Sequence, residues 1–517
     1  MTAKRDLRLG IDVGGTNTDA VVVDASGVVR ARHKAPTTPA VFDGVGTALA
    51  AVLSGVDASA VGQVMLGTTH PLNAVIRRSG LGRVGVLRVG APATLSVPPL
   101  AGWPADLVDV VRGPVAIVRG GHEYTGVEGQ PLDEGAVRDF AERCGGRVDA
   151  VAVTAMGSPV NPAHERHAAD LVREVLGDVP VTESRDVGGI GLLERENSAI
   201  LNSALVGVGR QVAESLVTAL ARHRITPDVY LTQNDGTLLT VEEAIRRPVL
   251  TIGSGPTNSM RGAAYLSGLS DAVVMDVGGT STDVGLLVDG FPRESAMAVD
   301  IGGVRTNYRM PDLIAIGLGG GTVVSEDDDL RIGPDSVGYR ITSEALAFGG
   351  TTLTLSDVST AAGRGAVGDR RRLSAVDGAL VRRVLKVIDE RFSALADRIK
   401  VSGGAQPLIA VGGGAHLLPE RLDGISAVHR HEHADVANAI GAAIAEASGS
   451  VDRTFSYAER GREASLEEAR ELAVEQAVRA GADPARVRIT ALTEVPMSYM
   501  PGDSVRVQAK AVGPLLS

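Results

Sequence analysis

The alternation of apolar runs and polar turns predicts two closely related β-hairpins, one near the start of the chain and one just past its middle. The first stretch is LRLGIDVGGTNTDAVVV, residues 7–23, and the second is AVVMDVGGTSTDVGLLV, residues 272–288. In each, an apolar run ends in Asp-Val-Gly-Gly-Thr, and Thr-Asp opens a second apolar run, which is the pattern of strand, glycine turn and strand. Because the central motif repeats almost letter for letter, we expect the hairpins to act together.

The chemistry of the two turns indicates a bound anion. Glycines let the backbone approach a ligand closely and point amide N–H groups at it, while Asp12 and Asp276 supply hard oxygens suited to Mg²⁺. A single turn of this kind is equally well explained as a hairpin with structural glycines. Two copies, each closed by Thr-Asp at Asp19 and Asp283, favour two halves of one phosphate clamp over coincidence.

Elsewhere, short apolar runs between turns predict an α/β chain. The segment after the first hairpin continues as a third strand before any helix. Gly253 and Gly255 precede a helix start, where backbone amides can face a phosphate or a carbonyl, and no GxxxxGK[ST] phosphate loop occurs. We expect further strands at residues 85–89, 115–118, 150–154 and 298–301, and helices at residues 42–52, 134–143, 374–398 and 465–480, with a long one ending near residue 222.

A polar cluster follows the short strand VGQVML, where the chain reads GTTHPLN. Thr68, Thr69, His70 and Asn73 stand at a strand end and at the start of a helix that begins near Pro71. Hydroxyls, an imidazole and an amide at such a place can bind an anion or a polar substrate. In the alternative interpretation, Thr69 only caps the helix and His70 packs beside it.

Composition narrows the class of protein. A length of 517 residues exceeds what one core usually supports, so we expect two or three domains. The net charge of −11 and the pI near 5.5 argue against a nucleic-acid partner. Cys144 is the only cysteine, which excludes an internal disulfide, and its place near a helix end suggests a surface or half-buried position. Without an apolar run of about 18 residues or a leader pattern, we expect a cytoplasmic enzyme that contacts no membrane.

Two histidine groups are weaker candidates for a metal site. His164 and His167 lie on a predicted helix, but their spacing differs from the HExxH of zinc enzymes. His429, His431 and His433 alternate along the chain, so on a strand they would share one face and could converge on a cation. An exposed charged loop explains the second group more simply, and we prefer that interpretation.

Ten motifs stand in order over about residues 7–340. They are LGIDVGGTNTDAVVVD, LGTTHPLNAVI, GGHEYTG, SPVNPAHE, LLERENSAILNSAL, LTQNDGTL, GSGPTNSMRGAA, MDVGGTSTDV, IGLGGGTVV and LRIGPDSVG. Together they resemble the alpha-type (hydantoinase A-like) subunit of the ATP-dependent hydantoinase/oxoprolinase family. The resemblance implies an α/β fold of the actin, sugar kinase and Hsp70 class, also called ribonuclease H-like, in which two lobes close over ATP.

The resemblance also suggests how the chain is divided. We expect an N-terminal lobe over residues 1–180, a second, nucleotide-binding lobe over residues 181–450 and a small C-terminal α/β appendage over residues 451–517. Longer family members carry a Pro-Gly-Pro and Cys-Tyr segment where this chain has GYRITSEALAFGG, and their long C-terminal region is reduced here to the appendage. These departures leave the ATP clamp in place and indicate a short subgroup.

The resemblance implies a role for each residue singled out. Asp12 and Asp276 would hold Mg²⁺, and Asp12 would face the γ-phosphate of ATP. On the acceptor side, the GTTHPLN cluster would bind substrate, with His70 as an acid or base. The nucleotide would contact Gly14, Gly15, Thr16, Thr18, Gly278, Gly279, Thr280, Thr282, Gly412, Gly413 and Gly414.

The implied reaction is the ATP-dependent opening of a cyclic amide, such as a hydantoin, 5-oxoproline or a lactam, with the carbonyl oxygen phosphorylated before hydrolysis. A companion beta-type hydantoinase subunit is the implied partner, so a hetero-oligomer is expected. Three alternatives share the same clamp. They are a small-molecule kinase of the sugar kinase type, a non-catalytic nucleotide-driven reactivase and an acetone-carboxylase-like subunit.

Overall fold

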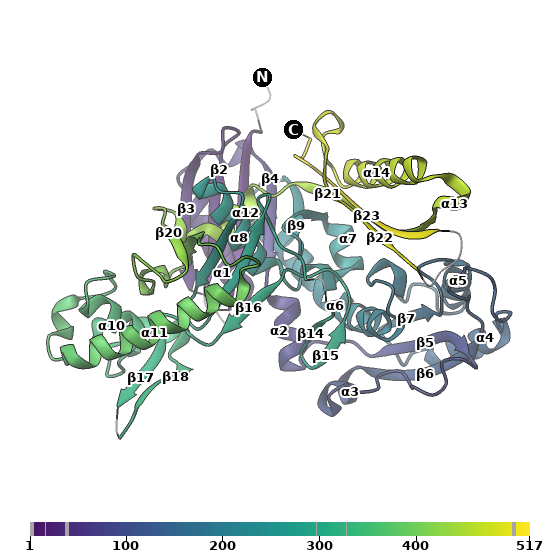
Figure 1. The fold of residues 1–517 in the computed structure, drawn as a ribbon, viewed down its shortest axis with the longest axis horizontal. Helices are drawn as coiled ribbons and strands as arrows, with labels where there is room; N and C mark the ends of the chain where they lie inside the picture. Colours follow the sequence, from purple (N-terminus) through teal and green to yellow (C-terminus); the bar gives the residue numbers. More distant parts are fainter. Residues whose placement is uncertain are drawn as a thin grey trace.

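The computed structural model describes the protein over residues 5–15, 17–36, 41–295, 297–326, 328–498 and 503–516. Two large sheets, one four-stranded parallel sheet and two small hairpins are packed with helices (Figure 1). The α/β class expected from the sequence is confirmed.

The first sheet contains strands from both ends of the chain. Its nine strands have the order β22-β23-β21-β10-β9-β4-β1-β2-β3, with β1 antiparallel to β2 and parallel to β4. Helices α1 (Val41–Leu53) and α6 (Leu192–Arg222) pack on one face, and α12 (Ala437–Ala443) packs on the other. The strands are β1 (Leu7–Val13), β2 (Asn17–Val23), β3 (Val29–Pro36), β4 (Val61–Thr68), β9 (Asp228–Thr232), β10 (Leu238–Thr240), β21 (Ala447–Ser456), β22 (Arg488–Pro496) and β23 (Ser504–Gly513).

The second sheet is built on the second hairpin. Its order is β13-β12-β11-β19-β20, and β16 pairs with β12. Apolar residues recur at helical spacing along α11 (Gly378–Ile399) and cover one face, while α8 (Ser254–Ser267) covers the other. The strands are β11 (Ala272–Val277), β12 (Thr282–Val288), β13 (Phe291–Pro292), β16 (Leu313–Ile316), β19 (Gln406–Val411) and β20 (Ile425–His429).

The third sheet is parallel throughout and lies at the lower right of Figure 1. Its order is β6-β5-β7-β8. Helices α4 and α5 cover one face, and the first half of α6 covers the other. The elements are β5 (Val84–Ala91), β6 (Arg112–Arg119), β7 (Ala150–Ala155), β8 (Val181–Glu183), α4 (Glu134–Cys144) and α5 (Ala163–Leu176).

Helix α6 joins the first and third sheets. By length and composition it is the one described helix that could cross a membrane, but its apolar residues fill the cores of both sheets. Two buried charged residues near its start anchor it to the parallel sheet: Glu196 accepts from Arg88 Nε at 2.8 Å, and Arg195 donates to the carbonyl of Ala155 at 2.8 Å. This packing identifies α6 as a core helix.

The remaining elements are short. The hairpin β14–β15 packs against α6 through Ile301 and Val304, β17–β18 packs on the core of the second sheet through Val324, and α14 packs on β21 and β23. Their bounds are α2 (His70–Arg77), α3 (Ala105–Val111), α7 (Val241–Arg246), β14 (Val299–Ile301), β15 (Val304–Thr306), β17 (Thr322–Glu326), β18 (Leu330–Ser336), α9 (Ile341–Glu344), α10 (Leu355–Ala361), α13 (Tyr457–Arg460) and α14 (Arg462–Arg479).

Sheet membership does not follow the boundaries expected at residues 180 and 450. Strands β9 and β10 follow residue 180 but extend the first sheet, and β21 to β23 complete that sheet instead of forming a sheet of their own. The surface or half-buried position expected for Cys144 is wrong. Its side chain is fully buried between α4 and the parallel sheet, and burial raises the pKa of the thiol to about 11.

Candidate functional site

The two glycine turns have the same structure. Asp12 is opposite Asp19 in the first hairpin, and Asp276 is opposite Asp283 in the second. The turns close with equivalent hydrogen bonds, from Gly14 N to the carbonyl of residue 17 at 2.9 Å and from Gly278 N to that of residue 281 at 2.8 Å. The repeated motif therefore encodes a repeated backbone, with an aspartate at the end of each first strand.

Asp12 is buried, and each of its carboxylate oxygens accepts a hydrogen bond from an amide. Asn258 of α8 donates to Oδ1 at 3.0 Å, and Asn438 of α12 donates to Oδ2 at 3.1 Å and to Asp19 Oδ2 at 2.8 Å. Burial raises the pKa of Asp12 to about 6 against the effect of these donors, and the charges of Asp19 and Asp276 raise it further. The two amide donors thus fix the orientation of the carboxylate, which is mostly ionised at pH 7.

The second aspartate belongs to the same cleft. Burial raises the pKa of Asp276, whereas a hydrogen bond from Ser259 and the charge of Lys34 lower it. Burial and the neighbouring Asp276 raise the pKa of Asp283 to about 7. Helix α8 links the two hairpins, because its Asn258 donates to Asp12 Oδ1 at 3.0 Å and the adjacent Ser259 donates to Asp276. Lys34 Nζ lies 2.6 Å from Asp19 Oδ1.

The carboxylates of Asp12 and Asp276 suit Mg²⁺ only if a phosphate-bearing molecule supplies further ligands to the metal. No group of three or more His, Cys, Asp and Glu within the described chain could hold a metal ion. Mg²⁺ usually takes one or two carboxylates, several waters and the phosphates of its substrate. Asp12 and Asp276 therefore fit the metal position of a nucleotide complex and not a closed protein site.

The Gly-Gly-Gly turn lies against the second hairpin. Gly412 has φ 87°, and a Cβ there would lie 2.3 Å from Asp276 Oδ1, so only glycine fits. Gly414 N donates to the carbonyl of Val277 at 2.7 Å. Gly413 is exposed, with no atom within 4 Å of the position that a Cβ would take. The backbone of Gly413 is therefore accessible to a ligand, and it lies one residue from the contact between Gly412 and Asp276.

The other predicted phosphate contacts are placed as follows. Gly15 is exposed with open space around it, as a residue that approaches a ligand would be. Thr18 is buried and its hydroxyl has no partner, whereas Thr282 donates to the carbonyl of Leu318 at 2.5 Å. A further glycine loop holds the second turn through two hydrogen bonds, from residue 320 to Gly278 and from residue 321 to Gly279. Thr280 is exposed at the tip of the second hairpin, and Thr16 lies outside the described residues.

The expected acceptor cluster lies beside the first hairpin. In the parallel pairing of β1 and β4, Asp12 is opposite residue 67 and Val13 is opposite Thr68. Thr69 makes no capping hydrogen bond; its backbone N–H donates to the carbonyl of Val13 at 3.2 Å and its hydroxyl donates there at 3.3 Å. Thr69 does occupy the N-cap position of α2, so the alternative that it caps the helix stays open. Asn73 Nδ2 donates to the Thr69 hydroxyl at 3.3 Å.

His70 opens helix α2 and is half-buried. Its backbone N–H donates to the hydroxyl of Thr68 at 3.1 Å. Burial, followed by the charge of Arg77, lowers the pKa of its imidazole, which favours the neutral ring at physiological pH. The residues Thr68, Thr69, His70 and Asn73 therefore form one polar patch next to Asp12, and their part in substrate binding stays a prediction.

Four residues that contact the aspartates of the hairpins were not predicted from the sequence: Lys34, Asn258, Ser259 and Asn438. Asn258 and Asn438 come from helices that cross at small residues, where a Cβ on residue 441 would lie 1.9 Å from the carbonyl of Asn258. Residues 434–445, ADVANAIGAAIA, form a run of small residues, which is typical of close helix packing. The asparagine within this run could have identified Asn438 as a site residue, because a polar side chain in a tightly packed helix needs a hydrogen-bond partner.

The histidine candidates do not form metal sites within the described residues. His164 accepts from the backbone N–H of Gly121 at 2.9 Å and pairs with Glu128 at 3.0 Å, which uses both ring nitrogens. His431 accepts from the backbone N–H of His433 at 3.2 Å in the loop after β20. The interpretation of the second group as a charged loop is in accord with this geometry.

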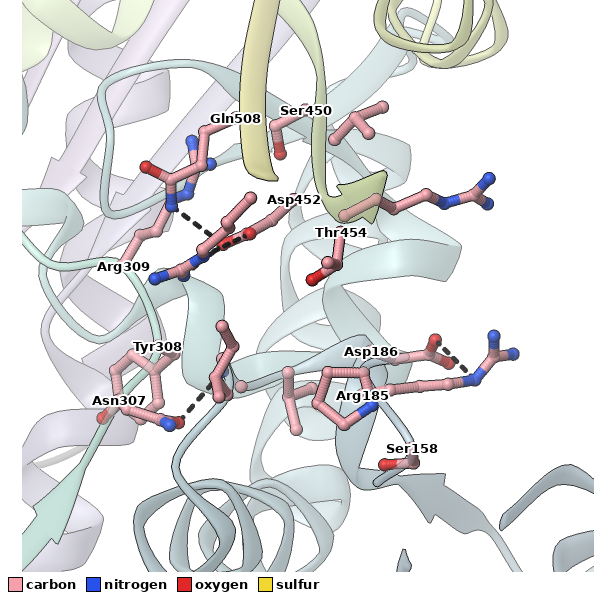
Figure 2. Close-up of a pocket in the computed structure, with 18 of the residues that line it drawn as sticks. Ser158, Arg185, Asp186, Asn307, Tyr308, Arg309, Ser450, Asp452, Thr454 and Gln508 are labelled. Carbon is pink, nitrogen blue, oxygen red and sulfur yellow. Dashed lines mark hydrogen bonds and ion pairs between the residues drawn. The ribbon is translucent and has the colours of Figure 1, made fainter. Parts of the chain in front are cut away.

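A cavity of about 1320 Å³ lies apart from the hairpins (Figure 2). Its walls come from the carboxyl ends of β7 and β8, from residues 294–309 and from β21 and β23, while no hairpin residue lines it. Residues 233–235 form part of the wall and follow Thr232, whose hydroxyl accepts from Asn258 at 3.0 Å. One short segment therefore separates this cavity from the cleft.

The chain is similar to known proteins over most of its length. Residues 8–176 match the family described as hydantoinase/oxoprolinase N-terminal region, and residues 195–407 match the one described as hydantoinase/oxoprolinase. Caprolactamase subunit alpha from Pseudomonas jessenii is 30% identical over 410 residues, 70% of this chain and 55% of that protein. Acetophenone carboxylase gamma subunit from Aromatoleum aromaticum is 28% identical over 402 residues, 69% of this chain and 53% of that protein. The chain spans about half the length of these curated relatives.

A solved structure shows the same fold. The ATP-dependent caprolactamase from Pseudomonas jessenii aligns with a TM-score of 0.78 and 21% identity over 98% of this chain and 88% of that chain. The alignment shows that the chain shares the fold of that caprolactamase, and its two glycine hairpins have equivalent registers. The chain belongs to the hydantoinase/oxoprolinase family.

Proposed function

We propose that the chain is the ATP-using subunit of an enzyme that opens a cyclic amide. The observation that supports this most directly is the pair of glycine hairpins with equal register, whose aspartates Asp12 and Asp276 are both contacted by helix α8. An unstrained amide is a poor electrophile, so coupling its opening to ATP makes chemical sense. The family membership and the 30% identity to a caprolactamase subunit favour a lactam-like substrate over a sugar.

In this proposal the protein positions the phosphates and balances their charge. Open glycine backbone at Gly15 and Gly413 receives the nucleotide, and Asp12, held by two amides, is aimed at the transferred phosphate. Mg²⁺, when bound between Asp12 and Asp276, would neutralise charge on the phosphates. Positioning and charge neutralisation are what phosphoryl transfer chiefly needs from a protein.

The proposed reaction balances with two waters. The amide carbonyl oxygen attacks the γ-phosphorus, the bond to the β-phosphate breaks, and ADP leaves. Water then attacks the activated carbon and the ring C–N bond breaks, which leaves an acyl phosphate on the opened chain. A second water releases the phosphate and yields an amino acid. A neutral His70, next to Thr69 and Asn73, is the candidate to accept the proton of the attacking water, whether this chain or a companion subunit completes that step.

A second candidate is ATP-dependent carboxylation of a ketone. It is favoured by one observation, the 28% identity to acetophenone carboxylase gamma subunit, which is close to the identity to the caprolactamase subunit. The clamp would then activate a carbonyl oxygen in the same way, while the carbon would be attacked by a different partner. The products separate the two candidates.

The test is phosphate release from ATP with hydantoin, 5-oxoproline, ε-caprolactam and acetophenone, with and without the product of a neighbouring gene. The proposal predicts release that depends on a cyclic amide and yields a ring-opened amine by mass spectrometry. Asp12→Asn should abolish the release. Asp24→Asn removes an exposed carboxylate at the far end of the same hairpin and serves as the matched control that should retain it.

Three outcomes would overturn the proposal. A stable phosphorylated product would indicate a kinase. Bicarbonate-dependent release with acetophenone and a new carboxylate would indicate a carboxylase. Release that ignores every substrate, in the presence of the companion protein, would indicate a nucleotide-driven assembly factor.

A further inference from the structure

The strand order of the parallel sheet defines a topological switch point, which is where open α/β sheets usually bind their ligands. In chain order its strands are second, first, third and fourth, because the sheet runs β6-β5-β7-β8 with every pair parallel. Connections leave β5 and β7 toward opposite sides, so the gap between their carboxyl ends is a topological switch point. Ligands of open α/β sheets bind in the crevice at this point.

The loops at this point close over the strand ends. His122, in the loop after β6, donates its backbone N–H to the carbonyl of Met156 at 2.9 Å, and Met156 donates to the carbonyl of Val89 at 2.9 Å. Gly157 has φ 76°, and a Cβ there would lie 2.4 Å from the carbonyl oxygen of His122. The loops after β6 and β7 are therefore in direct contact, and residue 158 follows at once.

Two buried polar atoms in these loops have no protein partner. Ser158 is 2% exposed and His122 is 4% exposed, yet neither Ser158 Oγ nor His122 Nδ1 has a hydrogen-bond partner among the described residues. A buried polar group left unsatisfied is destabilising, so each of these atoms calls for an explanation. Ser158 lines the 1320 Å³ cavity, and Figure 2 shows it on the wall opposite Asp452.

The two carboxylates near the end of β8 are already paired with arginines. Glu183 is contacted by Arg173 at 3.0 Å and by Arg185 at 3.2 Å, so its charge is already balanced. Asp186, at the same wall, is contacted by Arg246 at 2.9 Å and by Arg185 at 3.9 Å.

Arg166 is an arginine at this wall that has no ion-pair partner among the described residues. Its side chain also lines the cavity, and no carboxylate of the described chain lies within ion-pair distance of it. Burial and the adjacent His164 lower the pKa of His122. The lowered pKa favours the neutral ring, which can take part in hydrogen bonds. A hydroxyl without a partner and a guanidinium without a counter-ion thus face one cavity.

We propose that this wall is a second ligand site, at which Ser158 and Arg166 bind the carboxylate or phosphate group of a small molecule whose remainder lies in the cavity. An oxyanion satisfies the Ser158 hydroxyl, and it gives Arg166 the bidentate partner that a guanidinium favours. The site uses no residue of the hairpin cleft, so it is separate from the proposed ATP site.

Hydrogen–deuterium exchange of the full chain tests the site locally, with inorganic phosphate and acetate as probes. We expect one or both anions to slow exchange in the segment 156–166. Ser158→Ala and Arg166→Ala should each lose this protection. Arg138→Ala, which removes an exposed arginine on the far side of the same unit, should keep it.

Asp12→Asn separates this site from the proposed ATP site. It removes the proposed ATP-dependent activity but should leave the protection at residues 156–166 unchanged. Protection by phosphate alone identifies a phosphate-bearing ligand, and protection by acetate alone identifies a carboxylate. If Ser158→Ala does not fold, as judged by its melting curve, the exposed Arg166→Ala decides. The proposal is refuted if neither anion protects this segment, or if protection persists in the Arg166 variant.

Discussion

Asp12→Asn should stabilise the ligand-free protein while it destroys the proposed activity. The carboxylate of Asp12 is 3% exposed and its pKa is raised from 3.8 to about 6, so at neutral pH the folded protein carries a charge that it disfavours. Asparagine keeps the shape without the charge. Asn258, whose Oδ1 is buried without a partner, can turn its amide to accept from the new side chain.

The magnitude follows from the pKa. One pKa unit corresponds to ~1.4 kcal/mol, so a rise from 3.8 to about 6 corresponds to about 3 kcal/mol at pH 7. Because the folded state binds the proton more tightly than the unfolded state, stability falls as the pH rises from about 4 to about 6. The variant lacks this loss, so its advantage should be near zero at pH 4 and reach about 3 kcal/mol by pH 7.

Urea unfolding of both proteins across this pH range measures the difference. Asp24→Asn is the control, because the pKa of exposed Asp24 is lowered to about 2 by Ser26 and its removal should bring no gain at pH 7. The reasoning would be refuted by equal pH dependence of the wild type and the Asp12 variant. It would also be refuted if the variant were stabilised yet still released phosphate with a cyclic amide.

Three further predictions concern single positions. Asn438→Ala removes a hydrogen-bond donor that favours the charged form of Asp12, so the pKa of Asp12 should rise. Because a hydrogen bond to a charged group contributes ~1.5 kcal/mol, the acid limb of phosphate release should move up by about one pH unit, which the pH profile of kcat measures. Gly412→Ala should abolish nucleotide binding in a titration with a fluorescent ATP analogue, whereas Gly403→Ala, in the exposed loop before β19 and with open space around it, should bind like wild type. Cys144, with its thiol pKa raised to about 11, should react with a thiol reagent only as fast as the chain unfolds, and rapid labelling of the folded protein would contradict its burial.

The hairpins could be predicted because their signals are local. An apolar run, two glycines and Thr-Asp specify strand, turn and strand within 17 residues, and β1, β2, β11 and β12 lie inside the expected stretches. The long helix expected to end near residue 222 likewise ends at Arg222. Each of these features depends on neighbours in the sequence, which the apolar pattern records directly.

The rest depends on contacts between distant segments. The pairing of β21 with β10 is a single ladder position, Leu238 with Ala447, and nothing in either sequence names its partner. The roles of Asn258 and Asn438 were missed for the same reason, since each lies on a helix whose own pattern shows only close packing. Cys144 was misjudged because the helix end that holds it is covered by the parallel sheet.

The partnership of Asp12 with Asn438 has a consequence for how the protein is made. The ribosome synthesises the amide partner more than four hundred residues after the aspartate, and strands β21 to β23 of the sheet that contains β1 emerge later still. Until then β10 exposes an open sheet edge, and the acidic group at the first turn lacks one of its two anchors. Asp12 therefore acquires both anchors only after residue 438 has been synthesised.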